Sequence, residues 1–107
     1  MEPRVRAIVI YETASGKAPY QDWFEGLGKR EQIIIDARLT RLRQGNLGSF
    51  RSVGNGVKEL KIDFGPGYRI YFAEDGDKIV VLLCAGDKGS QSNDIREAQE
   101  YWADYLS

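Results

Sequence analysis

The sequence predicts one small α+β domain in which a mostly antiparallel sheet packs against helices. Three observations lead to this class. The 107 residues are enough for a single core and fit one domain, residues 1–107. Segments of strand-like alternation are interspersed with segments of helical periodicity. Three strand-like segments then follow one another closely across short glycine-containing turns, which favours an antiparallel meander. The expected order is β-α-α-β-β-β-α.

The N-terminal third predicts a strand and a short helix. Residues 4–10 alternate β-branched and other side chains, as an opening strand does. Pro19 suits the first position of a helix because its missing N–H needs no partner there. A helix from Pro19 to about Gly26 would turn three apolar side chains toward the core: Trp23, Phe24 and Leu27.

A longer helix is predicted over residues 29–44, which contain no glycine or proline. Ile35, Leu39 and Leu42 recur at helical spacing and form a stripe for burial, and Gly45 ends the helix. The other faces carry arginines that suit a solvated surface or a contact with RNA or a protein partner: Arg30, Arg38, Arg41 and Arg43.

The second half of the chain predicts the sheet and a final helix. Residues 46–56 are a glycine-rich connection without the spacing of a nucleotide-binding loop. The predicted strands are residues 57–63, 68–72 and 79–85, and the last is apolar enough to be covered on both faces. Ser92 or Asn93 could cap the final helix. Its buried stripe would contain Ile95, Ala98, Trp102 and Leu106.

Composition excludes several classes of site. The chain has no histidine and a single cysteine, Cys84, so a Cys/His zinc site, a Ser-His-Asp triad and a Cys-His pair are all excluded. Cys84 lies in an apolar run and is expected to be a buried thiol. No apolar run approaches the ~18 residues of a membrane span, and the N-terminus lacks the pattern of a signal peptide. The expected location is the cytoplasm, without membrane attachment.

Four cations gather around the predicted meander. Lys58, Lys61 and Arg69 lie on neighbouring strands, and Lys88 lies in the loop after the third strand. Lys58 and Lys61 have opposite strand parity, so they share a face only if a bulge or a strand end intervenes. Four such cations are either ordinary surface charge or a phosphate-binding site. The net charge of −1 gives a nucleic acid little long-range attraction.

Residues 56–72 resemble the core segment of the RelE/ParE toxin superfamily: a basic-apolar strand, a glycine turn, then Tyr68-Arg69 before apolar and aromatic residues. Residues 82–88 also resemble the HigB-like branch, the phage-derived addiction-module killer proteins. The same likeness continues through Gln91, Asp94-Ile95, Ala98 and Tyr101-Trp102. The resemblance covers nearly the whole chain, and it implies a RelE-like fold.

The resemblance also implies a function: the toxin of a type II toxin–antitoxin module, an mRNA interferase that cuts mRNA on the ribosome without a metal or other cofactor. A helix-turn-helix antitoxin would be its partner. By position, Lys61 (or Lys58) is similar to the family's strand lysines, Arg69 to its Tyr-Arg arginine and Lys88 to its basic residue after the strand. We assign Arg69 and Lys88 to the phosphate and Lys61 to proton transfer, so these three are the expected catalytic residues. The RNA-binding residues would be Arg51, Lys58, Lys61 and Arg69.

Several alternatives stay open. Glu59 or Asp63 could be the general base, and Tyr101 or Tyr105 could lie near the site, as a C-terminal tyrosine does in some relatives. A ParE-like protein would inhibit DNA gyrase without cutting RNA. A decayed module would only bind its antitoxin. In any of these cases the antitoxin could add an extended segment to the edge of the sheet or cover the basic face.

Overall fold

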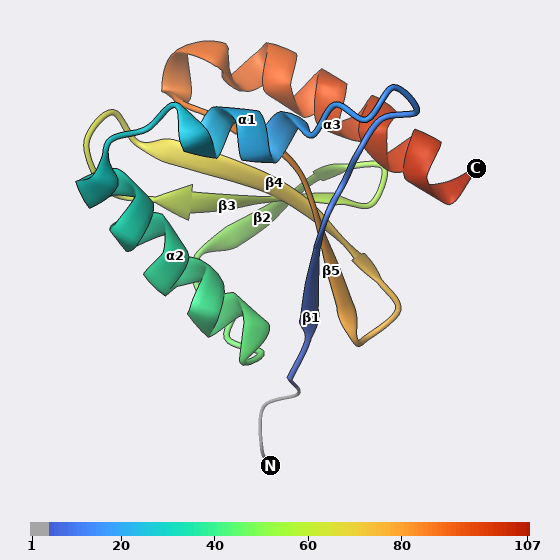
Figure 1. The fold of residues 1–107 in the computed structure, drawn as a ribbon. Coiled ribbons are helices and arrows are strands. Elements are labelled where there is room, and N and C mark those ends of the chain that lie inside the picture. The colour runs from blue at the N-terminus through green and yellow to red at the C-terminus, as the bar shows by residue number, and fades with distance from the viewer. Residues whose placement is uncertain (1–4) are drawn as a thin grey trace.

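The computed structural model describes residues 5–107, which form a five-stranded sheet with helices on both faces (Figure 1). Helices α1 and α2 cover one face and α3 covers the other. The strands lie in the order β1-β5-β4-β3-β2. The elements are β1 (Ala7–Ile10), α1 (Pro19–Glu25), α2 (Lys29–Arg43), β2 (Phe50–Gly54), β3 (Val57–Ile62), β4 (Tyr68–Asp75), β5 (Ile79–Gly86), a 3-10 turn η1 (Lys88–Ser90) and α3 (Gln91–Leu106).

The predicted α+β class is confirmed, and so is the mostly antiparallel sheet. Strand β1 pairs in parallel with β5, whereas the other three pairings are antiparallel. The first strand was predicted from Arg4, which lies outside the described residues, and it is observed from Ala7.

Strand β2 is an addition to the predicted order. Its residues belong to the segment predicted as a glycine-rich connection, yet they pair with β3 at the edge of the sheet. Only Val53 of this strand is partly buried, so the alternation that reveals a strand in a sequence is absent. A register shift between Ser52 and Gly54 further interrupts the pattern.

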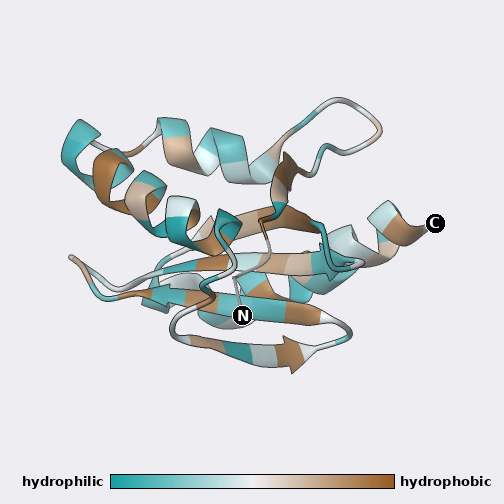
Figure 2. Cartoon of the chain, turned by 90° about the horizontal axis from the view of Figure 1, so that it is seen from below, coloured by the Kyte–Doolittle hydropathy of each residue, from teal (hydrophilic) through white to brown (hydrophobic). Residues whose placement is uncertain are grey.

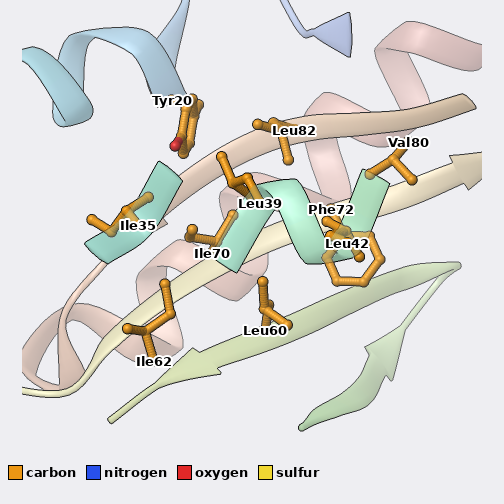
Figure 3. Packing of buried hydrophobic residues seen from close by; sticks show 10 residues of the cluster. All are labelled: Tyr20, Ile35, Leu39, Leu42, Leu60, Ile62, Ile70, Phe72, Val80 and Leu82. Atoms are coloured by element: carbon orange, nitrogen blue, oxygen red, sulfur yellow. The ribbon is translucent and has the colours of Figure 1, made fainter. Parts of the chain in front are cut away.

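The face toward α1 and α2 is closed by a single apolar cluster (Figure 3). The predicted stripe of Ile35, Leu39 and Leu42 is buried there, which confirms the inward face of α2. Its partners from the other elements are Tyr20, Leu60, Ile62, Ile70, Phe72, Val80 and Leu82. The predicted inward residues of α1, Trp23 and Phe24, and Leu27 just beyond it pack against the same cluster.

The opposite face is closed by α3. Ala98 and Trp102 are buried against Tyr71, and Ile95 packs beside them, as predicted. The helix begins at Gln91 after Ser90, so neither Ser92 nor Asn93 caps it. The prediction for Leu106 was wrong: its side chain is 62% exposed because the last turn extends past the sheet.

Strand β5 contains a bulge that determines which side chains face α3. Tyr71 pairs with Cys84 and Phe72 pairs with Leu82, so Leu83 is the extra residue. Leu83 and Cys84 therefore both pack on the α3 side, and Gly86 comes to lie opposite Arg69.

Hydrophobic and hydrophilic residues alternate along the helices, as expected for helices that bury one side (Figure 2). Within residues 5–107, every helix is too short or too polar to cross a bilayer.

Candidate functional site

A hollow of about 340 Å³ opens on the α3 side of the sheet, between β2, β3, β4 and the start of α3. We call it the central hollow. Its polar lining comprises Ser49, Arg51, Glu59, Lys61, Arg69 and Gln91. The strand register explains this grouping, because Arg51 lies directly opposite Glu59 and Lys61 lies directly opposite Arg69.

A buried carboxylate, Glu59, holds the polar groups of the hollow together. Its side chain is only 4% exposed. Arg51 Nε donates to Oε1 at 2.8 Å. Oε2 accepts hydrogen bonds from the Tyr71 hydroxyl at 3.0 Å and from Gln91 Nε2 at 2.8 Å. Both carboxylate oxygens are thus occupied by residues of three different elements, which fixes β2 and α3 relative to the sheet.

These contacts keep Glu59 ionised. Burial by itself would raise the pKa of Glu59, but the hydrogen bonds from Arg51, Gln91 and Tyr71 outweigh burial and lower that pKa below its ordinary value. Burial and the adjacent carboxylate raise the pKa of the Tyr71 phenol, so its hydroxyl remains a donor. An acid with a lowered pKa and two occupied oxygens is poorly suited to be a general base. The geometry therefore favours a positioning role for Glu59.

Arg69 is the buried cation of the hollow. Its side chain is 10% exposed, and its Nε lies 3.7 Å from Oε2 of Glu59. Nη1 donates to the carbonyl of Gly67 at 3.0 Å, but the buried Nε has no hydrogen-bond partner among residues 5–107. A buried N–H without a partner costs free energy, and an anion entering the hollow would be an acceptor for a guanidinium held in this way.

Lys61 and Arg51 add positive charge nearer the solvent. The Lys61 side chain is half exposed, and its Nζ lies 3.5 Å from Oδ1 of the exposed Asp63. The Arg51 side chain is 60% exposed even though its Nε is held by Glu59. The hollow therefore combines one buried and two accessible cations with a single buried carboxylate, which suits an anionic ligand.

Two of the predicted site residues lie elsewhere. Strand β3 pairs regularly with β4 from Lys58 to Ile62, so Lys58 and Lys61 face opposite sides of the sheet. Lys58 forms a salt bridge with Glu74, and its Nζ lies 5.7 Å from the centre of the Phe50 ring. Lys88 is exposed in η1, two residues beyond Gly86, and it does not line the central hollow. The structure thus groups Arg51, Lys61 and Arg69, but it does not group Lys58 or Lys88 with them.

The start of α3 completes the hollow. The sequence contains one sign of this packing, the glycine at the end of β5. Gln91 reaches Glu59 from the first residue of the helix. The first turn of α3 lies close to Gly86: a Cβ there would lie 2.0 Å from Oδ2 of Asp94 and 2.6 Å from Oγ of Ser90, so both side chains would have to move. A glycine that ends an apolar strand was the only available signal of this close packing.

The remaining candidates are occupied by packing or by other partners. The Tyr101 hydroxyl donates to Glu97 at 3.4 Å, and the Tyr105 hydroxyl donates to Asp75 at 2.7 Å. Neither tyrosine lines the central hollow. Cys84 is 7% exposed, which confirms the predicted buried thiol, and burial raises its pKa to about 12.

Comparison with known proteins identifies a family that covers most of the chain. The family described as phage-derived protein Gp49-like matches residues 22–101, which include every residue that we place in the central hollow. An uncharacterized protein of Haemophilus influenzae is 42% identical over 81 residues, which cover 75% of this chain and 82% of that protein. The chain therefore belongs to the phage-derived Gp49-like family, a RelE-like family of addiction-module toxins.

Proposed function

We propose that this protein is the HigB-like toxin of a type II toxin–antitoxin module and that it cleaves mRNA on the ribosome without a metal. Its partner would be a helix-turn-helix antitoxin, and its location the cytoplasm. The family supports the toxin role. The observation that carries the nuclease proposal is the buried Arg69 guanidinium, whose Nε has no hydrogen-bond partner among the described residues and which lines a hollow with Lys61 and Arg51.

The proposed reaction is transfer of a phosphodiester onto the neighbouring ribose hydroxyl. The 2′-oxygen bonds to phosphorus as the bond to the 5′-oxygen of the next nucleotide breaks. The 2′-hydroxyl loses its proton to a base and the departing 5′-oxygen gains one, leaving a cyclic phosphate and a 5′-hydroxyl. The additional negative charge of the pentacovalent phosphorane is what cationic residues would stabilise most.

Within this proposal each residue has a distinct role. Arg69 binds the phosphorane oxygens from the base of the hollow, and Arg51 contacts the RNA nearer the solvent. Lys61 is the candidate proton-transfer group because it shares the face of Arg69 and is accessible. Lys88 would contact a phosphate outside the hollow, since its turn follows the strand partner of Arg69. Lys58 is left out because its ammonium is paired with Glu74 on the opposite face.

Replacement of Arg69 is the direct test. Inducing the wild-type chain in bacteria is expected to arrest growth and to produce cuts within translated mRNA, mapped by primer extension. Arg69→Ala should abolish both effects while circular dichroism still reports a folded protein. Arg96→Ala is the matched control, because Arg96 is exposed on α3 and does not line the hollow.

Other outcomes would replace the proposal. A folded Arg69→Ala variant that remains fully toxic would exclude Arg69 from the site. Growth arrest with intact message and accumulating double-strand DNA breaks would indicate a ParE-like gyrase inhibitor. A wild-type chain that binds its antitoxin but neither arrests growth nor cuts RNA would be a decayed module.

A further inference from the structure

A second hollow, of about 420 Å³, lies against α2 at the edge of the sheet. We call it the α2 hollow. Arg38 and Arg41 contribute to its lining from the helix, and Asn46 contributes from the loop that follows. Ser49 and Lys61 line this hollow as well as the central hollow. Because α2 packs on the face opposite α3, the two hollows open toward opposite faces and meet at these two shared residues.

The charge in the α2 hollow is predominantly positive. Three cations (Arg38, Arg41 and Lys61) are accompanied by one carboxylate, Asp63, whose side chain is 82% exposed. Positive charge is therefore continuous from Arg69 through Lys61 to the two arginines of α2. A ligand with one negative charge per repeating unit suits such a track better than a ligand with a single charged group.

Arg38 is held in place before any ligand arrives. It donates from Nη2 to the carbonyl of Leu47, and it lies over Gly48, where a Cβ would be 1.8 Å from Nη2. Gly48 has φ +62°, so the loop turns in a conformation that favours glycine and leaves space for the guanidinium. Burial, together with the like charge of Arg41, lowers the pKa of Arg38. An anion between the two arginines would relieve that repulsion.

An aromatic ring accompanies these cations. Phe64 is half-buried and lines the α2 hollow, and the guanidinium carbon of Arg30 lies 5.4 Å from its ring centre. Cations beside an aromatic side chain are the combination that sites for single-stranded nucleic acid use, because the cations follow the backbone and the ring contacts a base. Phe64 also packs against the apolar cluster under α2, which holds its ring in place at the hollow.

We propose that the α2 hollow binds the neighbouring nucleotide of the same single-stranded RNA whose scissile phosphate enters the central hollow. The RNA strand crosses the edge of the sheet over Lys61 and Ser49. Arg38 and Arg41 contact the phosphate next to the scissile phosphate. This inference rests on the proposed RNA cleavage, and it adds a second binding position on the face opposite Arg69.

The test measures how RNA length and salt affect binding. Single-stranded RNA oligomers of increasing length, with 2′-O-methyl sugars to prevent cleavage, are titrated by fluorescence anisotropy at several salt concentrations. Each phosphate contact to a single strand contributes about 0.7 to the slope of log K against log salt. Because both arginines contact the same phosphate, Arg38→Gln/Arg41→Gln should reduce that slope by about 0.7, and Arg41→Gln alone, at an exposed position, should reduce it by a smaller amount. Arg96→Gln should leave it unchanged.

A length dependence separates the two hollows. A dinucleotide, which can fill only the central hollow, should bind the wild type and the double variant equally. Oligomers long enough to reach the α2 hollow should bind the double variant more weakly. Arg41→Gln keeps the test valid if removal of Arg38 perturbs the loop at Gly48.

Three results would overturn the inference or its basis. Unchanged slopes in both variants at every length, with binding still lost in Arg69→Ala, would refute the α2 hollow while leaving RNA cleavage intact. Variants that bind RNA normally but lose a co-expressed antitoxin would make the hollow a protein interface instead. Absence of RNA binding by the wild type, together with a fully toxic Arg69→Ala, would refute the proposed function itself.

Discussion

Replacing Glu59 by glutamine should destabilise the protein by removing one charge while keeping the shape of the side chain. The carbonyl oxygen of the new amide can accept from Arg51, and its NH₂ group can donate to Tyr71 and Gln91, since a hydroxyl and an amide can both reverse direction. The hydrogen bonds can therefore be retained. What is lost is the negative charge that faces Arg51 and the buried Arg69.

The distance between these two groups gives the magnitude. Arg69 Nε lies 3.7 Å from Oε2 of Glu59. Opposite charges about 4 Å apart attract by about 4 kcal/mol at an effective dielectric of about 20, and the carboxylate's own desolvation offsets part of that. Breaking a buried pair by removing one partner costs about 3–5 kcal/mol. With the hydrogen bonds retained, we expect a loss of about 2 kcal/mol in the free energy of unfolding, or about 10 °C in Tm for a domain of this size.

The pH dependence tests the charge specifically. The pKa of Glu59 is lowered in the folded protein, so its ionisation stabilises the fold above the ordinary glutamate pKa of 4.5, and this contribution is lost as the pH falls through the folded value. Urea unfolding of the wild type and Glu59→Gln should thus differ most near neutral pH and converge in acid. Glu74, whose pKa is also lowered, contributes equally to the stability of both proteins, so it does not affect the difference between them.

Glu100→Gln, at an exposed position on α3, is the matched control and should unfold like the wild type. Equal stability of Glu59→Gln and the wild type at neutral pH would refute the reasoning. A stability difference that stays constant down to acid would show that the ionised carboxylate is not its source.

Two further predictions concern the neighbourhood of the hollow. Gly86→Ala should displace the side chains of Asp94 and Ser90 and break the hydrogen bond between them, because the new Cβ would lie 2.0 Å from Oδ2 of Asp94. We expect about 1 kcal/mol lower stability by calorimetry together with weaker growth arrest. Gly26→Ala, where the nearest atom is 3.5 Å away, should be nearly neutral, and equal losses in both variants would contradict this account. The Cys84 thiol, with a pKa raised to about 12 by burial, should react with a chromogenic disulfide only after denaturation. Prompt labelling of the native protein would show that the thiol is accessible.

The elements that bury a regular face could be predicted from the sequence, and those at the edge could not. The stripe of Ile35 and Leu42 identified α2 because burial on one face imposes a helical period. Strand β2 imposes no such period, because it is an edge strand that buries little more than Val53. Its pairing depends on contacts with β3 that only the folded chain provides.

The sequence identified the cations that could form the site, but it did not show which of them lie together or that Glu59 is buried among them. Strand parity alone left Lys58 and Lys61 on different faces unless a bulge intervened, and regular pairing with β4 settles the question. Glu59 lies between Lys58 and Leu60 and could not be told from a solvated surface acid. Its burial depends on Arg51 and Gln91, which come from a strand and a helix distant in sequence.

The bulge in β5 has a consequence for how the length of this strand can vary in evolution. Loss of Leu83 would join Leu82 directly to Cys84, and the pairings of Cys84 with Tyr71 and Leu82 with Phe72 could persist without a bulge. Every other residue of the strand would keep its face, and Gly86 would still lie opposite Arg69. Loss of Cys84 in place of Leu83 would have the same effect, because both residues face α3. A deletion or insertion elsewhere in the strand would reverse the facing of the residues on one side of it. Relatives one residue shorter here are therefore expected to lack position 83 or 84.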